Sequence, residues 1–195
     1  MKSLSKNPVL EVIYKNTHQE LIEQCREGNQ RAQLEIYKIY HKAMYNTSLR
    51  ILNRAVDAED IMQDSFLDAF QHMHEYRGTA NFGAWLKRIV VNNSLDSLKK
   101  NSGLTFVEEY DHQVPQEESG EEDISPKVDE IHRAINELPS DYRVVLSLYL
   151  LEGYDHDEIA EILNISNNTS RIRYFRAKKK LLENIKESRI RQFII

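Results

Sequence analysis

The stretch "DHDEIAEILNISNNTSRIRYFRAKKKLLENI", residues 155–185, predicts two helices joined by a tight turn. Asp155 and Glu158 have the spacing of a capping box at the start of a short helix. Asn164 tolerates the left-handed backbone that a tight turn needs, and Ser166 is a typical N-cap for the next helix. A short helix, a turn and a longer second helix make the helix-turn-helix arrangement.

The second of these helices concentrates positive charge. It carries six Lys or Arg side chains between residues 171 and 180, although the formal net charge of the chain is -5. The run alone suits a solvated helix face equally well, but its helix-turn-helix context favours DNA binding, with arginines reading bases and lysines meeting phosphates. We expect packing from Ile165, Ile172, Phe175, Leu181, Leu182 and Ile185. We predict DNA contacts from Thr169, Ser170, Arg171, Arg173, Tyr174, Arg176, Lys178 and Lys179.

The residues before this pair predict two further helices. Residues 128–138 keep helical apolar spacing up to Pro139, which interrupts it. Ser140 is a candidate N-cap for "DYRVVLSLYLLEG", which ends at Gly153. With the helix-turn-helix pair, these segments predict a second domain over residues 127–187.

An acidic segment separates this domain from the rest of the chain. Residues 108–123 contain eight acids, no Lys or Arg, and little that is apolar. Such a segment buries too little surface to offset the entropy of ordering. We therefore predict a flexible acidic linker over residues 102–126; the alternative is a surface loop within one domain.

The residues before the linker predict a second all-α unit. Gly28 can end one helix and Asn29 can cap the next, while Asp57 with Asp60 can open a third. The stretch "YRGTANF" then separates the third helix from a fourth. Short connections between four such helices predict an N-terminal four-helix bundle over residues 17–101.

Composition and motifs argue against several functions. A lone cysteine, Cys25, allows neither an intrachain disulfide nor a multi-cysteine metal site, and its apolar surroundings predict a buried, inert thiol. Trp85 has core spacing rather than the setting of a ligand platform. No Gly-rich phosphate loop, nucleophile elbow or His-Glu-x-x-His motif occurs. We expect no enzyme activity, metal or cofactor, and, since no secretory signal or long apolar run occurs, a cytoplasmic protein.

Three stretches together resemble the extracytoplasmic-function group of bacterial RNA polymerase sigma factors, which keep only the second and fourth conserved sigma regions. They are "DAEDIMQDSF" at 57–66, "YRGTANFGAWLKRIVVN" at 76–92 and the segment 138–181. The resemblance spans about residues 20–100 and 128–186. It implies a protein that binds core RNA polymerase, recognises promoter DNA and initiates transcription, with region 2 before the linker and region 4 after it.

The resemblance also implies roles for individual residues. Asp60, Gln63 and Asp64 match the motif that grips the beta-prime clamp of the polymerase. A loop and the following helix match the segment that captures a base flipped from the minus-ten element, where an aromatic ring can stack and cations can meet phosphates. These positions are Tyr76, Arg77, Gly78, Thr79, Ala80, Asn81, Lys87, Arg88 and Asn92.

The second domain would then contact the upstream minus-thirty-five element and the beta flap. The implied partners are core RNA polymerase, promoter DNA and an anti-sigma factor, with no small-molecule substrate. Asn168, Ile172 and Tyr76 depart from the residues usual in the family, which leaves the promoter sequence open. A competing hypothesis is a helix-turn-helix regulator with a separate N-terminal sensory domain, which would hold a ligand and bind duplex DNA without polymerase.

Overall fold

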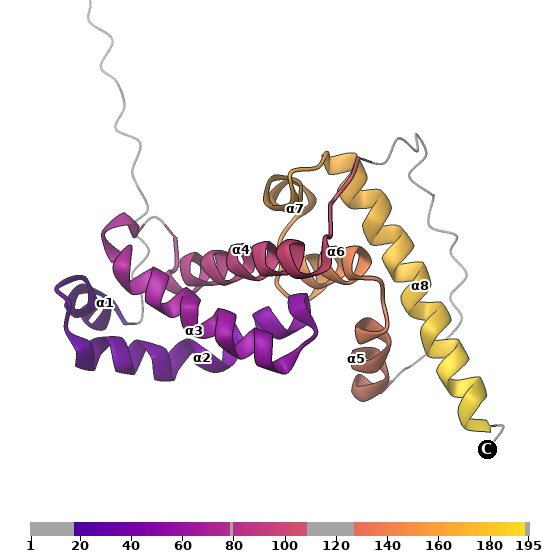
Figure 1. Ribbon diagram of the computed structural model, residues 1–195, viewed down its shortest axis with the longest axis horizontal. Helices are drawn as coiled ribbons and strands as arrows, with labels where there is room; N and C mark the ends of the chain where they lie inside the picture. Colours follow the sequence, from indigo (N-terminus) through magenta and orange to yellow (C-terminus); the bar gives the residue numbers. More distant parts are fainter. Residues whose placement is uncertain (1–17, 79, 109–126, 194–195) are drawn as a thin grey trace, which may run out of the picture.

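The computed structural model describes residues 18–78, 80–108 and 127–193. Within these ranges the chain forms α-helices and one short 3-10 helix, and no strand (Figure 1), so the predicted all-α class is confirmed. The elements are α1 (Gln19–Arg26), α2 (Gln30–Leu52), α3 (Ala55–Gln71), η1 (Met73–Glu75), α4 (Phe82–Ser102), α5 (Val128–Asn136), α6 (Ser140–Leu150), α7 (His156–Leu163) and α8 (Asn167–Phe193).

The N-terminal half is built on three long helices. α2, α3 and α4 each pack against the other two, while the short α1 packs mainly on α2. Asn29 caps α2 by accepting hydrogen bonds from Arg31 N and Ala32 N, as predicted. α3 begins at Ala55, two residues before the predicted start at Asp57. The core of this half contains Ile22, Ile36, Phe66, Phe82, Leu86 and Val90.

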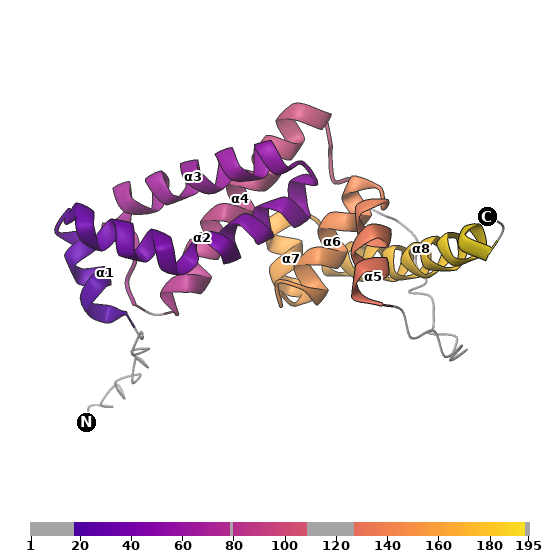
Figure 2. The same cartoon turned by 90° about the horizontal axis from the view of Figure 1, so that it is seen from below.

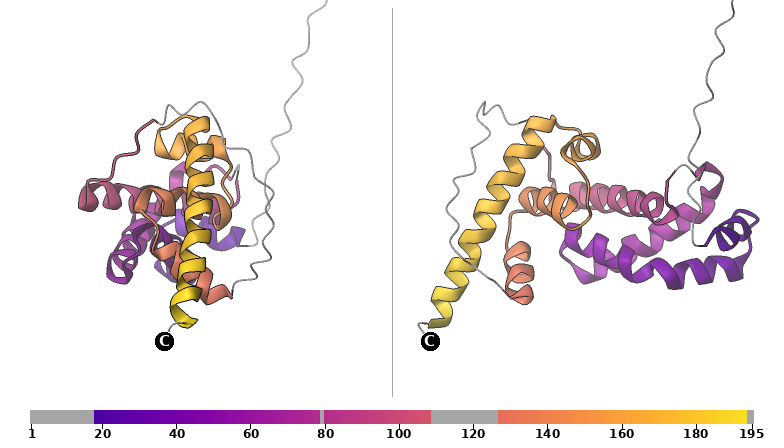
Figure 3. Two further views of the ribbon diagram at one scale, coloured as in Figure 1. Left: turned by 90° about the vertical axis from the view of Figure 1, so that its right-hand side faces the viewer. Right: turned by 180° about the vertical axis from the view of Figure 1, so that it is seen from behind.

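The C-terminal half packs three short helices along α8. α6 and α7 contact α8, and α5 lies against it as well (Figure 3). The predicted capping box of α7 is present, and Asn164 adopts the left-handed conformation at φ 54°. The Ser166 hydroxyl accepts from Thr169 N, which confirms its role at the start of α8. Ser140 was a wrong N-cap prediction, because it is the first residue of α6 and its hydroxyl accepts from the Arg143 guanidinium.

The two halves share an apolar core. Ile51 of α2 and Val91 of α4 belong to the same buried cluster as Val145 and Leu148 of α6 and Ile159 of α7. Figure 2 shows α6 and α7 beside the ends of α2 and α4. The C-terminal half is therefore seated on the N-terminal half through buried side chains.

Candidate polymerase-binding and nucleic-acid surfaces

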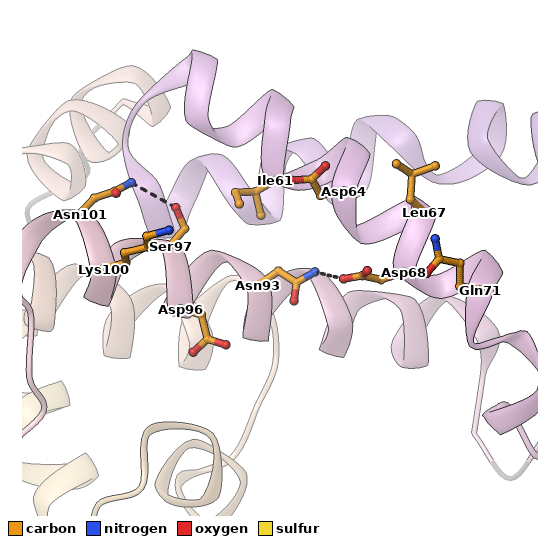
Figure 4. A pocket seen from close by; sticks show the side chains of 10 residues that line it. All are labelled: Ile61, Asp64, Leu67, Asp68, Gln71, Asn93, Asp96, Ser97, Lys100 and Asn101. Carbon is orange, nitrogen blue, oxygen red and sulfur yellow. Dashed lines mark hydrogen bonds between the residues drawn. The ribbon is translucent and has the colours of Figure 1, made fainter.

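The predicted polymerase-docking residues lie on the surface of α3. Asp60, Gln63 and Asp64 are exposed, and their spacing of three and four residues places them on one face of the helix. Asp64 borders a surface groove of about 630 Å³ between α3 and α4 (Figure 4). The face can therefore present carboxylates to a partner.

The groove beside Asp64 is lined by polar and acidic side chains together with the apolar Ile61 and Leu67. The Asn93 amide donates to Asp68 Oδ2 at 2.8 Å and to Ser65 Oγ at 3.1 Å, which fixes Asp68 at the groove wall (Figure 4). Asp64, Asp68 and Asp96 line the groove along with a single cation, Lys100. Excess carboxylate of this kind attracts Lys and Arg side chains of a partner.

The position of Tyr76 in the structure contradicts the predicted role of its ring in base capture. The residue is only 3% exposed, and its ring centroid lies 5.3 Å from those of Phe82 and Trp85. Its hydroxyl donates to the Ala80 carbonyl at 2.7 Å, and Arg26 donates to the Tyr76 carbonyl at 2.8 Å. The ring thus anchors the loop in the core, where no base can stack on it. Trp85 packs on the same core, as predicted.

Other members of the predicted base-capturing segment are open to solvent. Arg77, Ala80 and Asn81 are exposed, and so is Asn92 on α4. The Asn81 side chain accepts from Gly83 N at 2.8 Å and so caps α4. Gly78 has a φ of +74°, a conformation that favours glycine, and Thr79 lies outside the described residues. Among these exposed residues, Arg77 and Asn92 have side chains that can donate hydrogen bonds to a nucleotide.

The two predicted phosphate contacts on α4 are held by acids of the C-terminal half. Lys87 Nζ lies 3.3 Å from Glu152 Oε2, and Arg88 lies 3.0 Å from Glu161 Oε1. The Glu152 side chain is 3% exposed and also binds Arg50 at 2.7 Å. Sequence reasoning missed Glu152, because its partners on α2 and α4 lie 65 or more residues away along the chain.

The predicted DNA-contacting residues of α8 divide between exposed and buried. Arg171, Lys178 and Lys179 are exposed, and Arg176 is half-buried. Thr169 and Ser170 are fully buried and Arg173 is 4% exposed, so in this structure none of the three reaches solvent as predicted.

Distinct contacts cover these buried residues. The Ser170 hydroxyl is 2.9 Å from His156 Nδ1, which makes it a contact between α7 and α8. Arg173 donates to the Val107 carbonyl, and Thr169 donates to Glu108. Tyr174 is half-buried against Tyr149, with ring centroids 4.5 Å apart.

The apolar stripe predicted for α8 is largely confirmed. Ile172 is fully buried, and Ile165, Leu181 and Ile185 are at most 9% exposed. Leu182 was wrongly assigned to it, because this side chain is 39% exposed.

Several titratable groups respond to their surroundings. Burial raises the pKa of the Cys25 thiol to about 11, in keeping with the predicted inert cysteine. Hydrogen bonds from Thr169 and Ser166 lower the pKa of Glu108. Burial, followed by the charge of Arg171, lowers the pKa of His156. In the described part of the chain, no group of three or more His, Cys, Asp or Glu could hold a metal ion, and no helix is long and apolar enough to cross a membrane.

Comparison with known proteins matches both halves to parts of one family. Residues 36–103 match sigma-70 region 2 and residues 129–181 match sigma-70 region 4. The RNA polymerase sigma-H factor of Pseudomonas aeruginosa is 30% identical over 174 residues, covering 83% of this chain and 90% of that protein. The ECF RNA polymerase sigma-E factor of Escherichia coli is 30% identical over 176 residues, covering 84% and 91%. The ECF RNA polymerase sigma factor SigW of Bacillus subtilis is 28% identical over 181 residues, covering 85% and 95%.

Solved structures show the same fold. The sigma factor RpoE of Bartonella quintana, solved with the anti-sigma factor NepR, matches with a TM-score of 0.55 at 22% identity, covering 78% of this chain and 95% of that one. CnrH, solved with the cytosolic domain of CnrY, matches with a TM-score of 0.54 at 21% identity, covering 87% and 97%. Regions 2 and 4 in this order define a sigma-70-type transcription factor. Within that class, the chain belongs to the extracytoplasmic-function group of RNA polymerase sigma factors.

Proposed function

We propose that this chain binds core RNA polymerase, directs it to promoter DNA and opens the start site through a division of labour between its two halves. The observation that carries this proposal is the order of the two sigma-70 regions along the chain. Residues 17–101 would dock on the polymerase and melt the minus-ten element, and residues 127–187 would contact the upstream element, with 102–126 as the linker. The protein would act in the cytoplasm.

The α3 face is the proposed polymerase contact. Asp60, Gln63 and Asp64 would bind the beta-prime clamp, while the C-terminal half would meet the beta flap. The exposure of Asp60, Gln63 and Asp64 supports their role in binding the clamp, because complementary charge steers association only where it is accessible. The acidic groove between α3 and α4 extends the same negative surface.

Strand opening would rely on binding rather than on chemistry. Arg77 and Asn92 would hold a base that has left the stack. Lys87 and Arg88 would meet the phosphates beside it after leaving Glu152 and Glu161, which hold them in this structure. Because captured bases offset the cost of unpairing, the process needs neither ATP nor a catalytic residue of this chain. The chain would therefore act as an initiation factor and not as an enzyme.

The upstream element would be read by α8. Arg171 is exposed near the start of the helix, where a recognition helix meets base edges in the major groove. Lys178 and Lys179 are exposed farther along, where lysines suit phosphates. Arg176, which is half-buried, would complete this surface.

An anti-sigma factor is a further proposed partner. Two solved structures with this fold are complexes, one of the sigma factor RpoE with the anti-sigma factor NepR and one of CnrH with the cytosolic domain of CnrY. A protein of that kind would compete with the polymerase or with DNA for the surfaces described above.

Co-purification tests the proposal against an ordinary helix-turn-helix regulator. The tagged chain should retain core RNA polymerase at a one-to-one ratio, measured by mass photometry of the eluate. A chain that bound duplex DNA tightly and retained no core enzyme would instead be a regulator.

A further inference from the structure

Residues 104–108 run from the end of α4 to the first turn of α8 (Figure 1), and we call them the linker strap. Leu104 and Phe106 are half-buried and pack against the apolar core that α6 and α7 share with the N-terminal half. Val107 and Glu108 follow and reach side chains at the start of α8. The strap is thus held by apolar contacts at one end and by polar contacts at the other.

The Glu108 carboxylate is bound by three donors at the N-terminus of α8. It accepts from Ser166 N at 2.6 Å, from the Ser166 hydroxyl at 2.8 Å and from the Thr169 hydroxyl. Main-chain N–H and hydroxyl groups at a helix N-terminus are also the donors that hold a DNA phosphate. The lowered pKa of Glu108 agrees with an ionised carboxylate bound by these donors.

The strap also binds the side chain of Arg173. The guanidinium donates to the Val107 carbonyl and lies 5.4 Å from the centre of the Phe106 ring. Arg173 is consequently 4% exposed, and the neighbouring Thr169 is fully buried. Both were expected to face DNA, and while the strap is in place neither can.

We propose that the linker strap masks the DNA-binding surface of α8, with Glu108 in the position of a DNA phosphate, and that duplex binding requires the strap to leave. This inference rests on the proposed function, since it takes α8 to be the DNA-contacting helix. The strap continues directly from α4, so a partner that separates the two halves would also pull it from α8. Docking on the N-terminal half would then be coupled to exposure of the DNA-binding helix.

Duplex binding by three full-length variants tests the mask. Glu108→Gln weakens the contact to α8, and Phe106→Ala loosens the strap without changing charge. Glu137→Gln, at an exposed position of the turn after α5, removes one negative charge elsewhere. The measurement is fluorescence anisotropy of a labelled random-sequence duplex without polymerase, at several salt concentrations.

We expect the first two variants to bind about tenfold more tightly than the wild type, which corresponds to ~1.4 kcal/mol. The Glu137→Gln control should change affinity less than about twofold, as expected for screened surface charge. The salt dependence should steepen by ~0.9 in log–log slope for each phosphate newly contacted. Circular dichroism melts of all variants verify that a gain in binding comes from folded protein.

Hydrogen exchange of residues 164–170 reports strap release directly, because Ser166 N loses its acceptor when Glu108 departs. Faster exchange together with tighter binding supports the mask. The masking proposal is overturned if Glu108→Gln binds the duplex no more tightly than Glu137→Gln and Phe106→Ala binds it no more tightly than the wild type. This holds whether or not hydrogen exchange becomes faster. Run-off transcription by the wild type with core enzyme separates the two failures: transcription without any gain in duplex affinity refutes only the mask, and its absence refutes the proposed function.

Discussion

The ammonium group of Lys87 lies 3.3 Å from Oε2 of Glu152 and donates to the main-chain carbonyl of the same residue at 3.1 Å. Glu152 follows α6, whereas Lys87 belongs to α4 in the other half of the chain. The same carboxylate accepts from Thr47 at 3.0 Å and from Arg50 at 2.7 Å. The buried carboxylate of Glu152 thus joins α2 and α4 to the C-terminal half. It also binds Lys87, for which we propose a contact with a DNA phosphate.

Glu152→Gln should lower the free energy of unfolding by ~1–3 kcal/mol, since it leaves two partly buried cations without their carboxylate. Urea denaturation followed by circular dichroism measures the change. Glu161→Gln is the matched control, because the Glu161 side chain is 78% exposed. Its loss should cost less than about 0.5 kcal/mol. Equal costs for the two variants would show that Glu152 does not fasten the halves.

Arg171→Ala should weaken binding of holoenzyme to a promoter with its upstream element by ~1–3 kcal/mol if this arginine reads guanine bidentately. Lys179→Ala should weaken binding to all sequences alike, because it is expected to contact phosphate. Competition gel shifts with specific and scrambled upstream elements separate the two effects. Arg191→Ala, near the far end of α8, is the control. Unchanged sequence preference in Arg171→Ala would contradict the proposed reading face.

Asp60→Lys combined with Asp64→Lys should reduce retention of core polymerase about tenfold or more, because it reverses the charge of the α3 face. Both residues are exposed, so the variant should melt at nearly the wild-type temperature. Glu20→Lys with Glu27→Lys makes the same charge change at exposed positions in and beside α1. Normal retention by the α3 variant, or equal loss in both variants, would refute the docking face.

The local features of the fold could be predicted because their hydrogen bonds close within a few residues. The capping box of Asp155 and Glu158, the left-handed Asn164 and the Ser166 cap each follow from side-chain type and short spacing. Apolar periodicity located most of the core of α8 for the same reason, although Leu182 lies outside it.

The long-range contacts could not be predicted from the sequence in this way. Glu152 meets Thr47 across 105 residues, and Glu108 meets Thr169 across 61, so no sequence spacing relates the partners. Tyr76 was assigned to base capture because it matches the base-capturing loop of the family, and a loop has no periodicity that tells inward from outward rings. Its burial against Phe82 depends on the tertiary packing.

The burial of Tyr76 changes how base capture should be tested. Tyr76→Ala should destabilise the N-terminal half by ~3–5 kcal/mol, as for other buried aromatic rings, and so cannot report on DNA alone. Asn92→Ala should leave stability nearly unchanged, because Asn92 is exposed, yet impair melting of duplex promoter. Permanganate footprinting on duplex and on pre-melted templates measures this, with Asn136→Ala, at an exposed position at the end of α5, as the control. Equal defects of Asn92→Ala on both templates would argue against a role in opening.

The lowered pKa of His156 predicts a pH dependence of stability. Burial and the charge of Arg171 favour the neutral ring, with Asp155 and Asp157 opposing. The unfolded chain binds a proton at His156 more readily than the folded chain does. The contribution of the neutral His156 ring to the free energy of unfolding is therefore complete above the ordinary pKa of 6.5, and it is lost as the pH falls toward the lowered pKa. Melting temperatures between about pH 7.5 and 5.5 should therefore fall less in His156→Gln than in the wild type. Parallel curves for the two proteins would refute this linkage.

Transcription from a genomic promoter library by purified core RNA polymerase, with and without this chain, tests the central claim most directly. If the chain is a sigma factor, its addition should create a set of new transcript 5′ ends that share upstream and minus-ten sequence elements. The Asp60→Lys, Asp64→Lys double variant should abolish that set while remaining folded. Tight binding of the chain to duplex DNA, with no transcript start that depends on the chain, would contradict the account.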